Sequence, residues 1–189
     1  MMWKKFQNYT INYLLNFKTV NEIGKYLVSE HINDEPFKSE KILISKEMVY
    51  HFLSGTGDEN ALHQTEDGAK QSVFAEKLGG KMVTPGFFTE SLLANKENLW
   101  KALTIEEPHE VINISSSTRW TAPIPVGSEV FFTFKIKKVN TMAGKPDADI
   151  KVDWSMVEFD TKAYYIAEDG KETLCMKNSY TVGYVPTKN

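Results

Sequence analysis

The segment Thr84-Pro85-Gly86-Phe87-Phe88-Thr89-Glu90-Ser91-Leu92-Leu93-Ala94 is apolar over most of a helical circumference. Thr84 suits the N-cap of a helix and Pro85 suits its first position, so the sequence predicts a helix that starts here. A helix with apolar residues on nearly every side is stable only where other elements cover it, because exposing that surface to water is unfavourable. We therefore expect this helix to be buried at the centre of the fold.

The chain beyond Glu110 changes to an alternation of apolar and polar residues, which is typical of half-buried antiparallel strands. The alternation is clear over 132–137, over 150–156 and again over 174–181. The dipeptide Asp169-Gly170 predicts a β-hairpin turn between the last two of these segments. A buried helix followed by a long antiparallel sheet is accommodated most simply if the sheet curls around the helix. The predicted class is therefore α+β, with the hot-dog architecture.

Two helices are predicted upstream of the central helix. A short strand at 41–44 leads into the first helix, for which Ser45 is a suitable N-cap and Gly57 a suitable end. The second helix is expected to start near Thr65 and to end at the glycine pair 79–80.

Residues 1–40 carry large apolar side chains at roughly helical spacing, which predicts one or two accessory helices. The length of 189 residues and a hydrophobic content of 41% fit a single core. We therefore expect an N-terminal accessory helical extension over 1–40 and one hot-dog domain over 41–189.

The composition argues against several functional classes. A net charge of -3 and Arg119 as the only arginine give no bulk attraction to nucleic acid. Cys175 is the only cysteine, which excludes an intrachain disulfide and a cysteine-based zinc site and fits a reducing compartment. No apolar run reaches the roughly 18 residues that span a bilayer, and no cleavable leader is expected. We expect a cytoplasmic protein that binds neither nucleic acid nor membrane and needs no metal or cofactor.

The motif Gly57-Asp58-Glu59-Asn60-Ala61-Leu62-His63 places a carboxylate and an imidazole five positions apart on a turn. A carboxylate and an imidazole held close together can share one water molecule, as the addition of water to an activated double bond requires. Asp58 and Asn60 are also common turn formers, and His63 alone could be an ordinary surface histidine. The motif by itself leaves both interpretations open.

Three segments in order resemble the MaoC-like dehydratase family, which includes the R-specific enoyl-CoA hydratases. The first is the motif 57–63, the second is the helix start at 84–93, and the third is Ala122-Pro123-Ile124-Pro125-Val126-Gly127-Ser128 before a long strand. The resemblance covers about residues 41–185 and leaves the first 40 unexplained. It departs from the family pattern at two positions, where Ala61 replaces a proline and Pro85 replaces a histidine.

The resemblance implies a site made of Asp58, Asn60, His63 and Gly86. Asp58 and His63 would hold the water and transfer protons, and Asn60 would orient the pair or the substrate. The Gly86 amide, near the start of the predicted helix, lacks an intrahelical acceptor. It can therefore donate to a thioester oxygen that gains negative charge. Close packing of the helix on the sheet explains a glycine at position 86 equally well.

The implied activity is (R)-specific hydration or dehydration of an enoyl or 3-hydroxyacyl thioester, carried on coenzyme A or on acyl carrier protein. A homodimer is also implied, because a curled sheet leaves an open edge. Two alternatives remain: a hot-dog acyl-CoA thioesterase with Glu90 as its acid, and a non-catalytic protein that binds acyl thioesters. Lys70, Lys77 and Lys81 are candidates for the phosphates of coenzyme A from their position alone.

Overall fold

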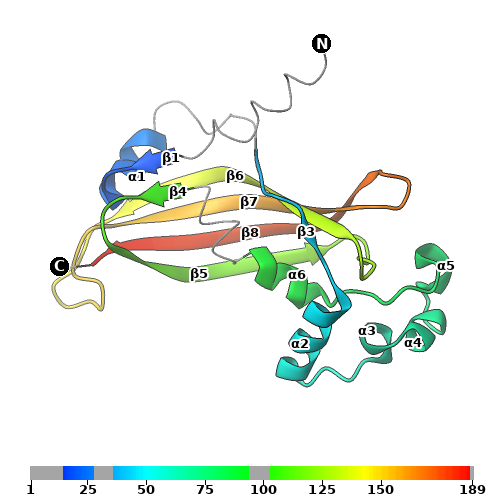
Figure 1. Ribbon diagram of the computed structural model, residues 1–189. Helices are drawn as coiled ribbons and strands as arrows, with labels where there is room; N and C mark the ends of the chain where they lie inside the picture. Colours follow the sequence, from blue (N-terminus) through cyan, green and yellow to red (C-terminus); the bar gives the residue numbers. More distant parts are fainter. Residues whose placement is uncertain (1–14, 28–35, 94–102, 188–189) are drawn as a thin grey trace, which may run out of the picture.

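A six-stranded antiparallel sheet forms the body of the structure (Figure 1). The computed structural model describes residues 15–27, 36–93 and 103–187. The strands follow the order β2-β6-β7-β8-β5, with β3 paired to β6 beside β2. Their bounds are β2 Phe37–Lys38, β3 Ile42–Leu43, β5 His109–Trp120, β6 Glu129–Met142, β7 Trp154–Ile166 and β8 Glu172–Pro186. The predicted long antiparallel sheet is confirmed, and so is the hairpin, since Gly170 turns between β7 and β8 at φ 79°.

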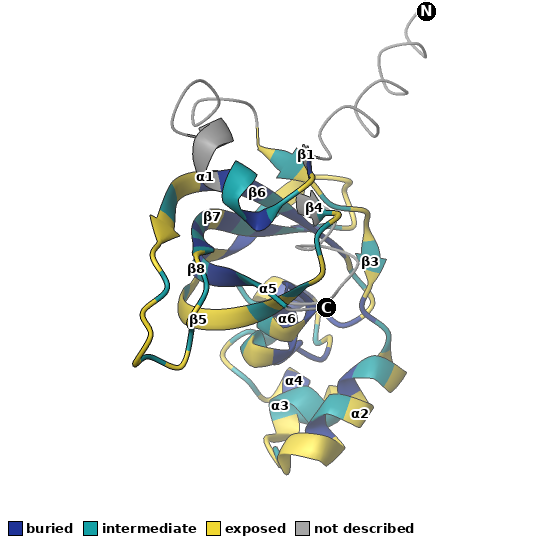
Figure 2. Ribbon diagram, turned by 90° about the vertical axis from the view of Figure 1, so that its left-hand side faces the viewer, coloured by how far each residue is buried: buried dark blue, intermediate teal, exposed yellow. Residues whose placement is uncertain are grey.

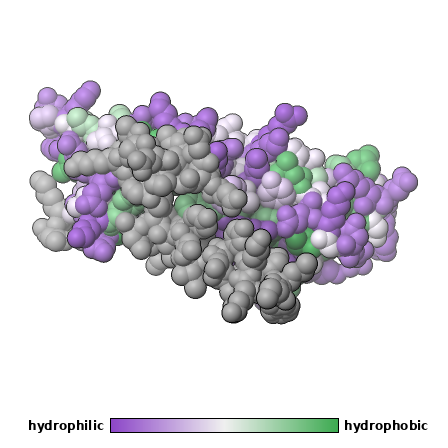
Figure 3. Space-filling model, turned by 90° about the horizontal axis from the view of Figure 1, so that it is seen from above, coloured by the Kyte–Doolittle hydropathy of each residue, from purple (hydrophilic) through white to green (hydrophobic). Residues whose placement is uncertain are grey.

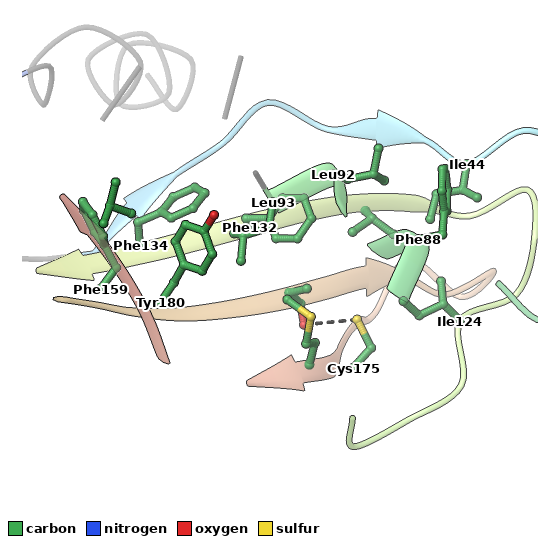
Figure 4. Close-up of a cluster of buried hydrophobic side chains, with 14 of the residues drawn as sticks. Ile44, Phe88, Leu92, Leu93, Ile124, Phe132, Phe134, Phe159, Cys175 and Tyr180 are labelled. Carbon is green, nitrogen blue, oxygen red and sulfur yellow. Dashed lines mark hydrogen bonds between the residues drawn. The ribbon is translucent and has the colours of Figure 1, made fainter. Parts of the chain in front are cut away.

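The central helix is α6 (Gly86–Leu93), which lies against the inner face of the sheet. Phe88, Leu92 and Leu93 of α6 belong to the same buried cluster as Phe132 and Phe159 of the sheet (Figure 4). The opposite side of α6 is not covered by the described chain, since Phe87 is 71% exposed. The predicted burial of the helix is thus confirmed for the face that meets the sheet.

The start of α6 differs from the prediction. The carbonyl of Pro85 accepts hydrogen bonds from the amides of Phe88 and Thr89, at 3.1 and 3.3 Å, so Pro85 is the N-cap and Gly86 the first helical residue. The predicted N-cap role of Thr84 is wrong. The amide of Thr84 donates to the carbonyl of Ile124 at 2.8 Å, which keeps its backbone extended beside that segment.

The segment between β3 and α6 contains four helices. Helix α2 (Lys46–Thr56) has the predicted ends, since the Ser45 hydroxyl accepts from the Met48 amide and Gly57 adopts φ 68°. The second predicted helix is instead two short ones, α4 (Glu66–Lys70) and α5 (Ala75–Leu78), and the motif itself forms α3 (Ala61–Gln64). The break follows from Ser72, whose hydroxyl donates to the Ala69 carbonyl and accepts from the Phe74 amide in place of helical bonds.

The described part of the first 40 residues contains strands as well as a helix. Helix α1 (Val20–Leu27) buries Val20 and Ile23 completely in the main core, and β1 (Leu15–Phe17) pairs in parallel with β4 (Leu103–Ile105). The prediction that this extension contains only helices is wrong at β1 and β2, which are strands. The other predicted helical residues of this extension, 1–14 and 28–35, lie outside the described residues.

The helices other than α6 lie at opposite ends of the sheet. Helix α1 lies at one end, whereas α2 to α5 gather at the other (Figure 1). Hydrophilic side chains predominate at both ends when the molecule is seen from above (Figure 3). Strand β5, at the edge of the sheet, is exposed along most of its length (Figure 2).

Candidate active site

Asp58 and Asn60 shape the turn between α2 and α3. The Asp58 side chain accepts a hydrogen bond from the Asn60 amide at 2.9 Å, and the Asn60 side chain accepts from the Leu62 amide at 3.1 Å. Each of these side chains therefore caps backbone groups, as a turn former does. Asp58 still has its second carboxylate oxygen, which has no hydrogen-bond partner among the described residues.

His63 is held in one tautomer by the segment that leads into α6. Its Nδ1 lies 2.7 Å from the carbonyl oxygen of Val83, which can only accept, so Nδ1 carries the proton. The Val83 amide in turn donates to the Leu62 carbonyl at 3.1 Å. In the neutral form of this tautomer the lone pair is on Nε2, and no described group hydrogen-bonds to this atom. A nitrogen in this state can accept a proton.

His63 is hydrogen-bonded to the segment that leads into α6 and not to the Asp58 carboxylate. Val83, which fixes His63, is three residues before Gly86, whereas Asp58 and His63 form no ion pair within 4.0 Å. The Gln64 side-chain amide donates to the Asp58 carbonyl at 2.8 Å and so fixes the main chain of the turn.

A surface hollow of about 460 Å³ lies beside Asp58. It is lined by Tyr50, Leu53, Ser54, Gly57, Asp58, Glu59, Gln64 and Thr65. Neither His63 nor Gly86 contributes to this lining. Of the predicted site residues, Asp58 alone therefore faces this hollow.

Gly86 has the free amide that the sequence predicted, although it is the first rather than the second residue of the helix. Within the described chain, neither Gly86 nor Phe87 donates its amide to any carbonyl. A Cβ atom added at Gly86 would lie 2.4 Å from Nε1 of Trp120, so the close-packing interpretation also holds. The glycine therefore admits the Trp120 ring and leaves two amides unpaired at a helix N-terminus.

A polar network that sequence reasoning did not find lies one turn further along α6. The half-buried carboxylate of Glu90 accepts from the hydroxyl of Ser116 on β5. The Asn178 amide, on β8, donates to Ser116 at 2.8 Å and to Thr118 at 2.5 Å. The available signal was Asn178 itself, which falls on the inward-facing side of its strand between Met176 and Tyr180.

The network runs from the exposed Ser116 hydroxyl to the buried Asn178 side chain. Asn178 is 2% exposed, and its Oδ1 has no partner within the residues that the structure describes. Burial raises the pKa of Tyr180, and the nearby Glu90 carboxylate raises it further. Glu90 thus has a hydroxyl partner, which accounts for a carboxylate on this helix.

The lysines considered for phosphate contacts are all exposed. Lys70 lies 3.3 Å from Asp67, and Lys81 forms an ion pair with Glu168. A role for Lys70, Lys77 or Lys81 in binding phosphate stays a prediction.

Over the described ranges, no group of three His, Cys, Asp or Glu side chains is arranged for a metal ion. No helix in the described ranges is both long and apolar enough to cross a membrane.

Several solved structures resemble this chain. No protein-family model and no curated protein sequence matches it. An (R)-hydratase from Pseudomonas aeruginosa is 14% identical, with 82% of this chain and 83% of that chain covered and a TM-score of 0.56. The (R)-hydratase from A. caviae involved in PHA biosynthesis is 17% identical (79% and 95% covered, TM-score 0.54). A MaoC-like dehydratase from Rhodospirillum rubrum is 15% identical (86% and 98% covered, TM-score 0.55).

These similarities confirm the predicted hot-dog fold. They also confirm, at the level of the fold, the resemblance to MaoC-like dehydratases and (R)-hydratases. Identities of this size establish architecture, whereas chemistry has to be argued from the residues of the site.

Proposed function

We propose that this protein catalyses the (R)-specific addition of water to an enoyl thioester, or the reverse dehydration of a 3-hydroxyacyl thioester. The carrier is coenzyme A or acyl carrier protein. One observation supports the proposal above all: the Val83 carbonyl holds the Nδ1 side of His63 and leaves Nε2 without a described partner, three residues before a helix start whose Gly86 amide is free. A proton acceptor and an oxyanion donor are thereby joined by one short, ordered segment.

In the hydration direction, the thioester carbonyl accepts a hydrogen bond from the Gly86 amide. His63 and Asp58 hold a water molecule between them, and this pair takes one proton from it as the water oxygen bonds to the β-carbon. The electron pair of the double bond moves toward the carbonyl, whose oxygen gains negative charge beside the N-terminus of α6. The pair then returns a proton to the α-carbon, so that H and OH have been added.

Asp58 and His63 share the roles of base and acid, because two groups around one water titrate as a unit. Asn60 has the supporting role in this scheme. Its side chain caps α3 through the Leu62 amide and so fixes the turn between Asp58 and His63. We infer that Asn60 contributes by positioning Asp58 and His63.

The test is the loss of conjugated-enoyl absorbance when the protein is incubated with crotonyl-CoA. We expect Asp58→Asn and His63→Ala each to lower kcat/KM by about 10²- to 10⁴-fold, the usual contribution of a positioned acid or base. His51→Ala is the matched control, since His51 is an exposed histidine on α2. No absorbance change with either carrier and several chain lengths would rule out the proposal.

The half-buried position of Glu90 favours a second candidate function, thioester hydrolysis. In that case crotonyl-CoA would release free thiol, and Glu90→Gln would abolish the release while His63→Ala would not. If neither reaction occurs but an acyl-CoA raises Tm, the protein binds acyl thioesters without converting them. Enoyl absorbance, free-thiol release and Tm, all measured on one preparation, separate these three functions.

A further inference from the structure

The outer face of the sheet carries an unbroken cross-strand line of residues at one register position. Lys38 on β2 pairs with Thr133 on β6, and Thr133 pairs with Lys162 on β7. Lys162 pairs with Lys177 on β8, and Lys177 pairs with Arg119 on β5. Paired positions point to the same face, so four cations lie along this line, which we call the cationic row.

This arrangement is unfavourable for the isolated protein. Lys162 stands directly opposite Lys177, and Lys177 directly opposite Arg119, and like charges in such positions destabilise a sheet. None of these three side chains forms an ion pair within 4.0 Å with a described acid, whereas Lys38 pairs with Glu172 at 2.9 Å. The chain as a whole has a net charge of -3, so its composition does not explain the clustering.

The adjoining positions do not neutralise the row. The next line on the same face consists of Lys135, Asp160, Ser179 and Ser117, with Asp160 as its single acid. In the following line Glu158 is engaged by Lys137 at 2.6 Å. An excess of positive charge therefore remains on the outer face of β5, β7 and β8.

The row ends beside the candidate active site. Arg119 directly precedes Trp120, whose indole covers Gly86 at the start of α6. Successive residues of a strand point to opposite faces, so Arg119 lies on the outer face just behind that contact. A partner seated on the row thus reaches the edge of the sheet where the reaction is proposed to occur.

We propose that the cationic row docks an acidic helix of the protein that carries the acyl chain. This inference rests on the proposed function and extends it, since it identifies the carrier as acyl carrier protein rather than coenzyme A. Strands are about 4.8 Å apart, so the four cations extend over about 19 Å. Acidic residues at i and i+4 on one helix lie about 6 Å apart, so three to four helical turns of about 5.4 Å each match this length.

The phosphates of a nucleotide fit this surface less well. They lie close together and are usually bound by donors that converge in a pocket, whereas the row is a line of separate charges along an exposed sheet face. Lys38 and Lys162 border a shallow hollow of about 360 Å³ at one end of the row. Charge complementarity along an extended line favours a macromolecular partner.

The test compares crotonyl-acyl carrier protein with crotonyl-CoA as substrates. We expect the triple variant Arg119→Gln/Lys162→Gln/Lys177→Gln to raise KM for the carrier-protein substrate by about tenfold or more, with kcat and the crotonyl-CoA parameters unchanged. The matched control removes the same charge from three exposed loop lysines: Lys145→Gln/Lys151→Gln/Lys171→Gln. This control should leave both substrates unaffected.

Two outcomes would overturn the inference: an equal rise in KM for both substrates, which assigns the row to nucleotide phosphates, or no change for either. If the wild-type protein converts neither substrate, the proposed function fails, and docking is then measured by calorimetry with holo-acyl carrier protein. Salt-sensitive binding that the triple variant loses would still support the row as a docking surface. Binding that the variant retains, or binding only to duplex DNA or anionic vesicles, would contradict it.

Discussion

The Cα atom of Gly86 lies under the indole of Trp120, and an added Cβ would come within 2.4 Å of Nε1. The same residue begins α6 and leaves its amide unpaired within the described chain. Gly86 therefore meets two separate requirements: it leaves room for the Trp120 ring, and it presents a free amide. Substitution by alanine keeps the amide but removes the space for the ring, so any effect of that change comes from displaced packing.

We expect Gly86→Ala to lower the free energy of unfolding by about 1–3 kcal/mol, the cost of overpacking a tight contact. Trp120→Ala should relieve most of this added cost, because it removes the ring that the new methyl group would meet. A double-mutant cycle from urea unfolding of the four proteins measures the coupling. Additive effects of the two substitutions would show that the ring does not constrain Gly86.

Ala61 stands where the family pattern has proline, and its surroundings accept a proline. Asn60, the residue before it, has φ -65° and ψ 115°, the extended conformation that proline requires of its predecessor. Ala61 is the first residue of α3 and donates no hydrogen bond to a described group. We expect Ala61→Pro to raise the free energy of unfolding by about 0.4–1 kcal/mol without loss of activity.

Leu62→Pro is the matched control for that prediction, measured in the same denaturation experiment. The Leu62 amide donates to the Asn60 side chain at 3.1 Å, so a proline there removes a capping bond and should destabilise the protein. If Ala61→Pro were also destabilising, the departure from the family pattern at position 61 would reflect a steric constraint at the turn.

At the level of elements, prediction succeeded where one local signal controlled each end. Ser45 and Gly57 define α2, and Asp169-Gly170 defines the β7–β8 turn, because each acts through its own backbone or nearest neighbours. Prediction failed where distant contacts decide. Thr84 is held extended by Ile124, some forty residues later, and no local pattern encodes that bond.

The contacts of the candidate site also divide into local ones, which the sequence predicts, and distant ones, which it does not. The motif from Asp58 to His63 could be found in the sequence, since all its members are near neighbours. The contact between Glu90 and Ser116, and that between His63 and Val83, join different elements and depend on how the sheet places them. Such contacts become visible only with the fold.

Strand β8 carries titratable groups that the fold keeps neutral. Burial raises the pKa of the Cys175 thiol from 9.0 to about 12 and also raises the pKa of Tyr180 and Tyr184. A raised pKa means that the unfolded chain releases the proton first. The stability from these groups is therefore complete below about pH 9 and is lost as the pH rises toward 12.

We expect the free energy of unfolding to fall between pH 9 and pH 10 with a contribution of up to about 1.4 kcal/mol per pH unit from Cys175. Cys175→Ala should remove that contribution, whatever its effect at neutral pH, because the variant has no thiol to titrate. Urea unfolding at pH 8, 9 and 10 measures both slopes. Equal slopes for the two proteins would show that Cys175 is not protected from ionisation.

At the level of the whole molecule, the sheet has two different edges. At one edge β2 and β3 both pair with β6, whereas the outer edge of β5 has no strand partner in the described chain. Exposed apolar side chains accompany this edge: Ile112 is 39% and Ile114 43% exposed. A long unpaired edge with apolar side chains is the surface on which sheets associate, which is the physical basis for expecting a homodimer.

We predict that two copies pair through β5 and that Ile112→Lys/Ile114→Lys converts the dimer to a monomer. Two added charges per chain would face their counterparts across the new interface, where like charges repel and burial is costly. Sedimentation equilibrium at micromolar concentration measures the mass. Val73→Lys, on a side chain 92% exposed beyond α4, is the control and should remain dimeric.

The same variant links assembly to catalysis, because Ser116 and Trp120 on β5 contact Glu90 and Gly86 on α6. Loss of the partner strand would free β5 to move relative to α6, so we expect turnover of crotonyl-CoA to fall together with the dimer fraction as the protein is diluted. A monomeric wild-type protein would contradict the predicted pairing. A monomeric variant with full activity would show instead that each copy holds a complete site.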